Sequence, residues 1–197
     1  TRITPLNAAE TVPLLQAFSR VTAHDLVSPL NVPGFDNSAM DGYAVRLAEL
    51  ADGAALPLAG KAFAGQPFNG VWPAGTCIRI MTGAPLPEGA DCVLMQELTD
   101  SGEETVQLYA AVKPLQNVVF RGEDVAAGAV IAPAGTVLTP AHLGVLAGQG
   151  YAEVAVCRPL TVGILSTGSE LLEPGALWTP GKIYDANGIQ NAARLRQ

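Results

Sequence analysis

Two carboxylates, an amide and a hydroxyl lie within six positions of one another in the segment PGFDNSAMDGYA, residues 33–44. The four polar residues are Asp36, Asn37, Ser38 and Asp41. So many turn-forming residues predict a shaped loop rather than the interior of a helix or a strand. Acidic groups on such a loop can hold a cation or orient a polar substrate. An Asx-turn followed by an Asp-Gly turn, without any chemistry, is the alternative interpretation.

The composition limits the classes of protein and of partner. Apolar residues make up 49 % of the 197 positions and charged residues 15 %, which excludes a disordered chain. The 21 glycines and 15 prolines are spread along the sequence, as in proteins with many short strands and tight turns. A net charge of −7 argues against nucleic acid and against an anionic membrane as partners. The net charge does not exclude an anionic substrate, because a metal ion or backbone amides can bind an anion locally.

The cysteines and histidines carry no recognisable site. The three cysteines lack CxxC spacing, so neither a disulfide framework nor a zinc site is expected. The two histidines have no His or Cys neighbour at ligand spacing. No apolar run reaches the roughly 18 residues that cross a bilayer, and the chain opens without a signal peptide. These features predict a protein of the reducing cytoplasm.

The segments before and after residues 45–113 predict a mixture of helix and strand. Residues 7–10 (NAAE) read as the capping box of a short helix, and residues 21–30 as an extended segment. Further along, strands are expected at 129–132, 136–138 and 152–157. Between the last two, Thr139 caps a helix that has Pro140 at its first position and ends at Gly148 or Gly150.

Residues 45–113 have a different residue pattern from the segments on either side. Apolar patches at 56–60, 75–80, 92–95 and 106–109 alternate with Gly, Pro and Asp turns. This spacing is typical of a small β-barrel or sandwich.

The last segment has the pattern of an open α/β sheet. Residues 160–165 form an apolar run typical of a buried parallel strand, and a polar, glycine-containing loop follows at 166–170. A helix is expected after Asn187. One strand and one helix leave apolar faces without partners, so we expect this α/β domain to be truncated in the chain.

Together these patterns predict a mixed α+β multidomain fold. A β-rich, barrel-like domain (43–120) is inserted within a small α/β domain made of residues 1–42 and 121–157. Residues 158–197 then begin the truncated α/β domain.

Five stretches, in the same order, resemble the molybdopterin molybdenumtransferase family of the MoeA and gephyrin E-domain type. They are residues 33–44, 79–87 (RIMTGAPLP), 121–125 (RGEDV), 165–171 (LSTGSEL) and 181–187 (GKIYDAN). The resemblance covers essentially the whole chain but only the N-terminal half of the family pattern. The family's later glycine-rich substrate loop, further acidic residues and last β domain have no counterpart in this sequence.

The resemblance implies an enzyme of molybdenum cofactor biosynthesis. Such proteins take adenylylated molybdopterin, release AMP with the help of Mg²⁺, and insert molybdate as the second substrate. They are elongated homodimers whose active sites are shared between protomers. The resemblance also implies contact with the molybdopterin adenylyltransferase and with molybdoenzymes. It makes residues 158–197 the start of a molybdopterin-binding domain and the chain by itself an inactive fragment.

Site residues follow from the matching motifs. The resemblance implies catalytic roles for Asp41, Thr82 and Glu170, with Asp41 also the metal ligand. Residues expected to contact substrate are Asp36, Ser38, Gly83, Ser166, Thr167, Gly168, Asp185 and Asn187. The residue types suit the chemistry, because carboxylates can hold the Mg²⁺ that neutralises phosphate oxygens. A Thr hydroxyl and loop amides can bind an oxyanion without a counter-ion.

Two other function classes compete with the enzyme. The first is a non-enzymatic scaffold or peptide-binding module of the same family, since open sheet edges can take up a peptide strand. The second is a β-barrel that binds another small ligand. The acidic loop favours the enzyme, because a scaffold has no need for four clustered polar side chains.

Overall fold

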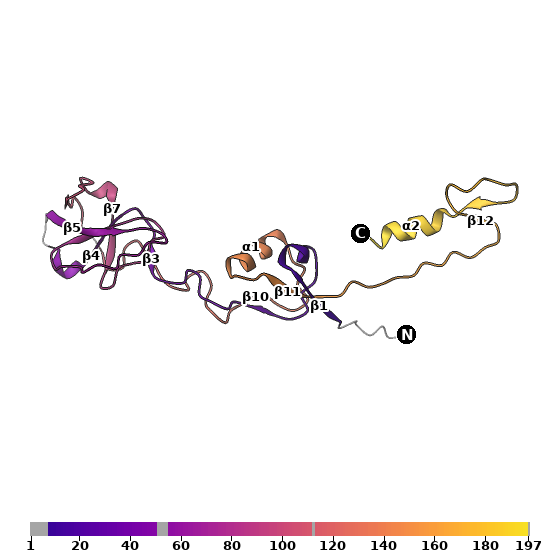
Figure 1. Cartoon of the computed structure of the whole chain (residues 1–197), viewed down its shortest axis with the longest axis horizontal. Helices are drawn as coiled ribbons and strands as arrows, with labels where there is room; N and C mark the ends of the chain where they lie inside the picture. Colours follow the sequence, from indigo (N-terminus) through magenta and orange to yellow (C-terminus); the bar gives the residue numbers. More distant parts are fainter. Residues whose placement is uncertain (1–7, 51–54, 112, 197) are drawn as a thin grey trace. The chain divides into compact units, whose positions relative to one another are not determined.

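The computed structural model describes residues 8–50, 55–111 and 113–196. Contacts between Cα atoms divide the chain into two compact units, one of residues Thr11–Val156 and one of Thr1–Glu10 with Cys157–Gln197. The described residues combine many short strands with the α-helices α1 (Pro140–Gly148) and α2 (Ala186–Arg194), so the expected mixed, β-rich fold class is confirmed (Figure 1).

A five-stranded sheet forms the centre of the β-rich segment. Its strand order is β7-β4-β6-β5-β8. β5 and β6 run parallel, and the other neighbouring strands run antiparallel. The strands are β4 (Gly42–Val45), β5 (Ala55–Ala62), β6 (Cys77–Ile80), β7 (Cys92–Met95) and β8 (Thr105–Gln107). Each of the four apolar patches singled out in this part of the sequence therefore contributes a strand.

Both faces of this sheet are covered. Side chains alternate between the faces of a strand, so Tyr43 and Val45 join one apolar cluster while Ala44 joins the other. The first cluster consists of Tyr43, Val45, Leu56, Cys77, Cys92 and Val106. The second consists of Ala44, Ala62, Ile78, Ile80, Ala84 and Val93. Coverage on both faces explains why every residue of β4 is buried.

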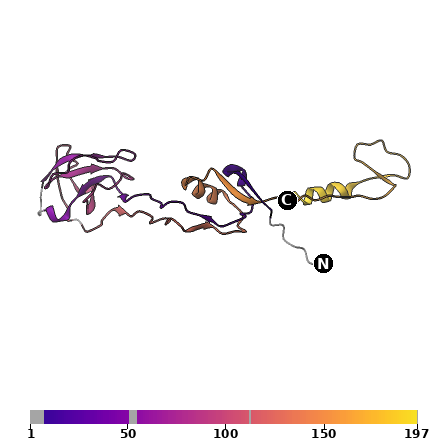
Figure 2. The same cartoon turned by 60° about the horizontal axis from the view of Figure 1, so that its bottom comes forward.

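A third apolar cluster joins segments that are far apart in the sequence. β2 (Leu26–Val27) pairs antiparallel with β10 (Val130–Ala132), and the two lie side by side in both views (Figures 1 and 2). β1 (Ala9–Pro13) pairs with β11 (Glu153–Cys157). The cluster contains Ala17, Leu26, Ala132, Leu138, Leu146, Val154 and Val156. This arrangement supports the proposed insertion, whose boundaries stay a prediction.

The remaining short elements link these parts. β3 (Asn37–Ser38) pairs antiparallel with β9 (Val118–Val119). The described residues before position 157 also contain the 3-10 helices η1 (Leu14–Ala17), η2 (Leu47–Glu49) and η3 (Gln96–Leu98). The expected helix at 140–148 is confirmed as α1, with Thr139 as its N-cap and Pro140 at its first position.

Two local predictions in this unit are wrong. Residues 9–13 form strand β1 instead of a helix, because they pair with β11, and only the single turn η1 follows. Asn7 of the expected capping box lies outside the described residues. Residues 136–138 form no strand beyond an isolated bridge from Val137 to Val21, although backbone hydrogen bonds join Thr136 to Thr22 and Leu138 to Arg20.

The second unit also departs from expectation. Residues 160–165 do not form the predicted buried strand, and Leu160 and Leu165 are 72 % and 87 % exposed. Within the described ranges no strand pairs with this run, and an apolar strand needs neighbours to take its backbone hydrogen bonds. β12 (Leu171–Leu172) and β13 (Ile183–Tyr184) instead form a small parallel pair.

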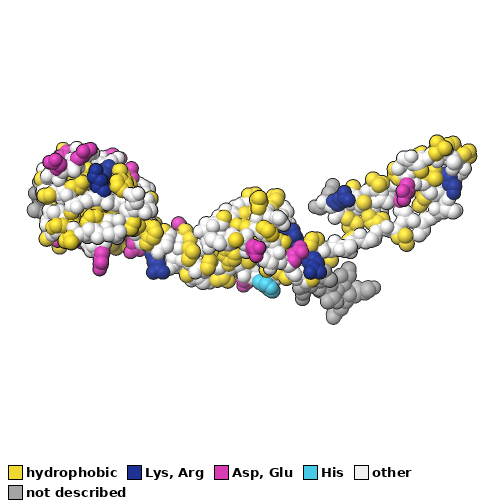
Figure 3. Space-filling view, viewed as in Figure 1, with side chains coloured by type: hydrophobic (Ala, Val, Ile, Leu, Met, Phe, Trp, Pro, Cys, Tyr) yellow, Lys and Arg dark blue, Asp and Glu magenta, His cyan; other side chains and the backbone are white. Residues whose placement is uncertain are grey.

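The helix expected after Asn187 is confirmed as α2, which begins one residue earlier and is capped by Asp185. Apolar side chains remain on the surface of this unit, as Figure 3 shows. A search of the described helices finds none long and apolar enough to cross a membrane.

Gly42 is a position in the sheet that leaves no room for a side chain. A Cβ atom there would lie 1.9 Å from the backbone oxygen of Leu94 on the neighbouring strand. We expect Gly42→Ala to lower the free energy of unfolding by about 2–3 kcal/mol or more, because β4 and β7 would have to move apart. Urea unfolding measures the effect.

Gly144→Ala is the matched control, since no atom lies within 4 Å of a Cβ at this position in α1. It should raise stability by about 0.5–1 kcal/mol through helix propensity. Equal stability of Gly42→Ala and the parent chain would contradict the close approach of β4 and β7.

Candidate functional site

Asp41 and Thr82 are brought together by the pairing of two strands. Asp41 directly precedes β4, and Thr82 follows β6 by two positions. Because the strands are antiparallel and Gly42 lies opposite Ile80, the start of β4 meets the end of β6. Oδ1 of Asp41 accepts hydrogen bonds from the Thr82 amide and from the Thr82 hydroxyl, both at 2.8 Å. Two of the three expected catalytic residues therefore contact each other.

These hydrogen bonds change the acidity of Asp41. The Thr82 amide, and after it the Thr82 hydroxyl, lower the pKa of this carboxyl group below its ordinary value of 3.8. Partial burial opposes the shift, and the charge of Arg79 adds to it. A carboxylate with a lowered pKa is a weak general base. It is well suited to carry a fixed negative charge that binds a cation.

The loop that holds Thr82 is fixed by backbone hydrogen bonds. Gly83 adopts a φ of +76°, a conformation that favours glycine, and its amide donates to the Ser38 carbonyl at 2.8 Å. The Ser38 amide donates in turn to Ala84 at 3.1 Å. Gly83 thus turns the chain after β6 so that Thr82 faces Asp41.

The segment 33–44 is less of a loop than its sequence predicts. Residues 37–38 lie in β3 and residues 42–45 in β4, since β9 and β6 supply partners for their backbone groups. Ser38, expected to contact substrate, is fully buried, and its hydroxyl donates to the Met40 carbonyl at 2.6 Å. This side chain shapes the turn that leads to Asp41.

Asp36 is exposed and joins two of the sequence motifs. Its Oδ1 accepts a hydrogen bond from the Arg121 amide at 2.7 Å. In the same turn the Phe120 amide donates to the Glu123 carboxylate at 2.8 Å. The geometry gives Asp36 the role of a cap that fixes the segment at 120–124 beside the start of β3.

The other expected site residues lie in the second unit. Oδ1 of Asp185 accepts from the Gly188 amide at 2.8 Å, and a hydrogen bond from the Ser166 side chain, followed by the Gly188 amide, lowers the pKa of Asp185. Gly168 lies against the carboxylate of Glu170. A pocket of about 480 Å³ is lined by Ser166, Gly168 and Asp185 together with Glu173, Gly188 and apolar residues.

The remaining two candidates belong to the same region but make fewer contacts. Thr167 is exposed between Ser166 and Gly168, and Asn187 lies in the first turn of α2, where its amide donates to Asp185. This unit therefore gathers six of the expected residues around one loop and one helix start. They are Ser166, Thr167, Gly168, Glu170, Asp185 and Asn187.

Arg79 is a site residue that the sequence reasoning did not single out. Its charge lowers the pKa of Asp41, and it lies three positions before Thr82 in the stretch RIMTGAPLP. The alternation of side chains along β6 is the signal that could have found it, because positions 77, 79 and 81 share one face of a strand.

A magnesium site has limited support in this chain. The described residues contain no group of three or more His, Cys, Asp or Glu side chains that could hold a metal ion. Mg²⁺ is nevertheless often bound through one or two carboxylates, with water and substrate phosphates completing its shell. The ionised Asp41 fits the role of such a single carboxylate.

The Asp41–Thr82 contact predicts a measurable pKa change. In Thr82→Val the hydroxyl donor is lost while the amide remains, so the pKa of Asp41 should rise yet stay below 3.8. Thr82→Ser keeps the hydroxyl and should keep the parent value. A ¹³C NMR titration of the Asp41 carboxyl carbon measures all three proteins, and identical values in the Val and Ser variants would contradict the contact.

The same pKa shift sets the direction of a pH effect on stability. The folded-state pKa of Asp41 is lowered, so the ionised group stabilises the folded protein. This stabilisation is fully present at pH values above the pKa of the unfolded chain, and it is lost as the pH falls through the lowered pKa of the folded protein. Thr82→Val should therefore lose less stability than the parent on acidification below about pH 4.

Known proteins match both the sequence and the structure. The family model described as MoeA N-terminal region (domain I and II) matches residues 1–150. A molybdopterin molybdenumtransferase of Haemophilus influenzae is 51 % identical over 175 residues, which are 88 % of this chain and 43 % of the relative. Molybdopterin molybdenumtransferase 2 of Mycobacterium tuberculosis is 45 % identical over 192 residues, which are 94 % of this chain and 47 % of that protein.

Solved structures lead to the same family. A crystal structure of a molybdopterin biosynthesis MoeA protein from Pyrococcus horikoshii superposes with a TM-score of 0.87 at 31 % identity, and covers 96 % of this chain and 50 % of that one. The chain thus spans about half the length of the relatives that it matches. Since the family model covers three quarters of its residues, the chain belongs to the MoeA family and contains the N-terminal region of that family.

Proposed function

We propose that this chain forms part of a molybdopterin molybdenumtransferase in molybdenum cofactor biosynthesis. The reaction is the insertion of molybdate into adenylylated molybdopterin, with release of AMP. Membership of the MoeA family supports the proposal at the level of the pathway. The observation that carries it at the level of residues is the Asp41–Thr82 pair, two hydrogen bonds of 2.8 Å to one carboxylate oxygen.

Asp41 is proposed to hold a cation next to the substrate phosphate. Its lowered pKa keeps the carboxylate charged at neutral pH, and both donors of Thr82 fix one of its oxygens in place. Mg²⁺, when bound there, would neutralise negative charge on the phosphate oxygens. A carboxylate whose orientation is fixed in advance loses little freedom when it binds such a cation.

Thr82 has a positioning role in this proposal. Its hydroxyl proton is donated to Asp41, so the side chain is not free to donate to an oxyanion at the same time. This differs from the expectation that the hydroxyl binds the oxyanion directly. A scaffold protein of the same family would need neither a fixed carboxylate nor its donors.

The second unit is proposed to contribute a substrate-binding pocket of its own. A pocket beside the start of α2 is lined by Ser166 and Asp185, which share a hydrogen bond, and a substrate group could bind there. Glu170 lies two positions after Gly168, which also lines this pocket. We propose further that the whole enzyme is a cytoplasmic homodimer whose protomers share each active site. The molybdopterin adenylyltransferase and molybdoenzymes would then be its partners on either side of the reaction.

A chimera tests the proposal. This chain replaces the corresponding half of the Haemophilus influenzae relative, to which it is 51 % identical. We expect the chimera to release AMP from adenylylated molybdopterin with Mg²⁺ and molybdate, and the isolated 197-residue chain to release none. Asp41→Ala in the chimera should lower turnover by about 10²-fold or more.

Asp36→Ala is the matched control, because it removes a carboxylate of the same segment that only caps the Arg121 amide. It should keep turnover within a few fold of the parent chimera, and circular dichroism should show both variants folded. Normal turnover of Asp41→Ala would remove Asp41 from the site. AMP release by the isolated chain would show that residues 1–197 suffice.

A further inference from the structure

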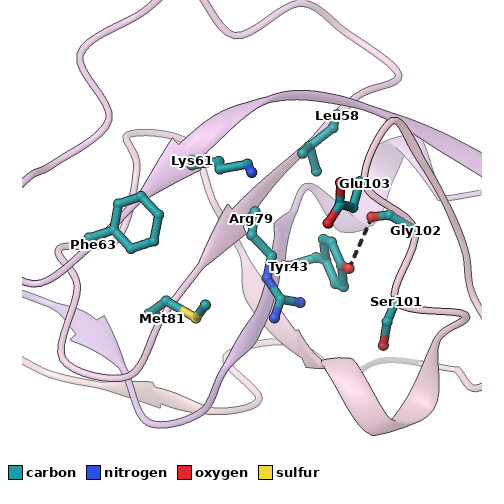
Figure 4. A pocket seen from close by; sticks show the side chains of 9 residues that line it. All are labelled: Tyr43, Leu58, Lys61, Phe63, Arg79, Met81, Ser101, Gly102 and Glu103. Atoms are coloured by element: carbon teal, nitrogen blue, oxygen red, sulfur yellow. Dashed lines mark hydrogen bonds between the residues drawn. The ribbon is translucent and has the colours of Figure 1, made fainter.

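Three side chains form a row across neighbouring strands of the central sheet. Arg79 on β6 lies opposite Lys61 on β5 and opposite Tyr43 on β4. Figure 4 shows Arg79 between the other two, with all three beside one pocket. Directly opposed residues point to the same face of a sheet, so the register alone brings the two cations together.

The described residues give neither cation an ion pair, although the charge of Arg79 acts on Asp41. Like charges directly opposite each other destabilise a sheet. Among the described residues, neither Lys61 nor Arg79 lies within ion-pair distance of a carboxylate, although Glu103 lines the same pocket. The sheet therefore places two positive charges side by side in a chain whose net charge is −7.

The guanidinium of Arg79 is held in place by its neighbours. Its Nη2 donates to the Gln96 side chain, and its guanidinium lies 4.7 Å from the centre of the Tyr43 ring. Nη1 is buried, and no hydrogen-bond acceptor contacts it in the part of the chain that the structure describes. Because Nη1 is closed off from solvent, a ligand in the pocket would meet the positive charge of the guanidinium rather than this nitrogen.

The pocket suits a small group. Its volume is about 220 Å³, below the roughly 300 Å³ at which pockets for drug-sized ligands begin. Leu58, Phe63 and Met81 supply apolar walls. Tyr43 is held in place by a hydrogen bond from its hydroxyl to the Gly102 carbonyl at 3.2 Å, which Figure 4 also draws.

We propose that Arg79 and Lys61 form a binding site for a tetrahedral dianion of the phosphate class, either free or as the terminal phosphate of a larger ligand. The guanidinium supplies a fixed positive charge beside the pocket, and the ammonium of Lys61 adds a point charge on a flexible stem. The two negative charges of the tetrahedral ion would neutralise both cations. The inference goes beyond the proposed function and does not depend on it.

Calorimetric titration of the chain with inorganic phosphate, at constant ionic strength in chloride buffer, tests the site. Lys61→Gln and Arg79→Gln should each weaken phosphate binding by about tenfold or more, since each removes a charge-assisted contact. Lys113→Gln is the matched control, because it removes the same charge at an exposed position outside the pocket. Glu103→Gln should tighten binding by removing a negative charge from the pocket.

AMP serves as the second probe and distinguishes the two sources of the anion. Tighter binding of AMP than of phosphate, with competition between them, would assign the site to a nucleotide or similar monoester. Equal affinity would assign it to the free ion. Lys61 is exposed, so Lys61→Gln keeps the test valid even if Arg79→Gln fails to fold.

Two results would overturn the site: no phosphate binding by the parent chain, or equal weakening in Lys61→Gln and Lys113→Gln. Because binding is measured without a reaction, either result would leave the proposed activity standing.

Discussion

The close packing of β4 between β6 and β7 is the constraint on which the candidate site depends. Gly42 allows it, since any side chain there would collide with the Leu94 carbonyl. Once β4 is in this position, Asp41 before Gly42 meets the loop after β6, and Tyr43 after Gly42 lies opposite Arg79. The Asp41–Thr82 pair and the Tyr43–Arg79 contact are thus two results of a single strand register, and the pairing of β5 with β6 adds Lys61 beside Arg79. A shift of one residue would turn Asp41 and Tyr43 to the opposite face.

This register places unlike charges at different ends of one sheet face. Asp41 is stabilised in its charged form mainly by neutral donors of Thr82, and Arg79 contributes only in addition. The carboxylate therefore keeps most of its charge available to a cation, while Arg79 and Lys61 keep theirs available to an anion. A ligand that carries a phosphate together with a divalent cation combines the two kinds of charge that this face can bind. The chain's overall charge of −7 gives no hint of such a local arrangement.

The second unit shows which elements local sequence signals can specify when no neighbouring strand is present. The helix expected after Asn187 forms as α2, because its cap by Asp185 needs only neighbouring residues. The apolar run at 160–165 stays extended and exposed, because a strand depends on neighbours that the described chain does not supply. The same distinction applies to residues 9–13, where pairing with β11 overrode a local helix signal.

The sequence by itself determined the features that rest on local chemistry: the strands of the β-rich segment, the helix capped by Thr139, and the motifs that mark the family. It also named Asp41 and Thr82. Tertiary structure decided what each does, because 41 positions separate them and the pairing of β4 with β6 aims the Thr82 hydroxyl at the carboxylate. It buried Ser38, made Asp36 a cap and set Lys61 against Arg79. Sequence shows which groups a chain carries, whereas register decides which of them meet.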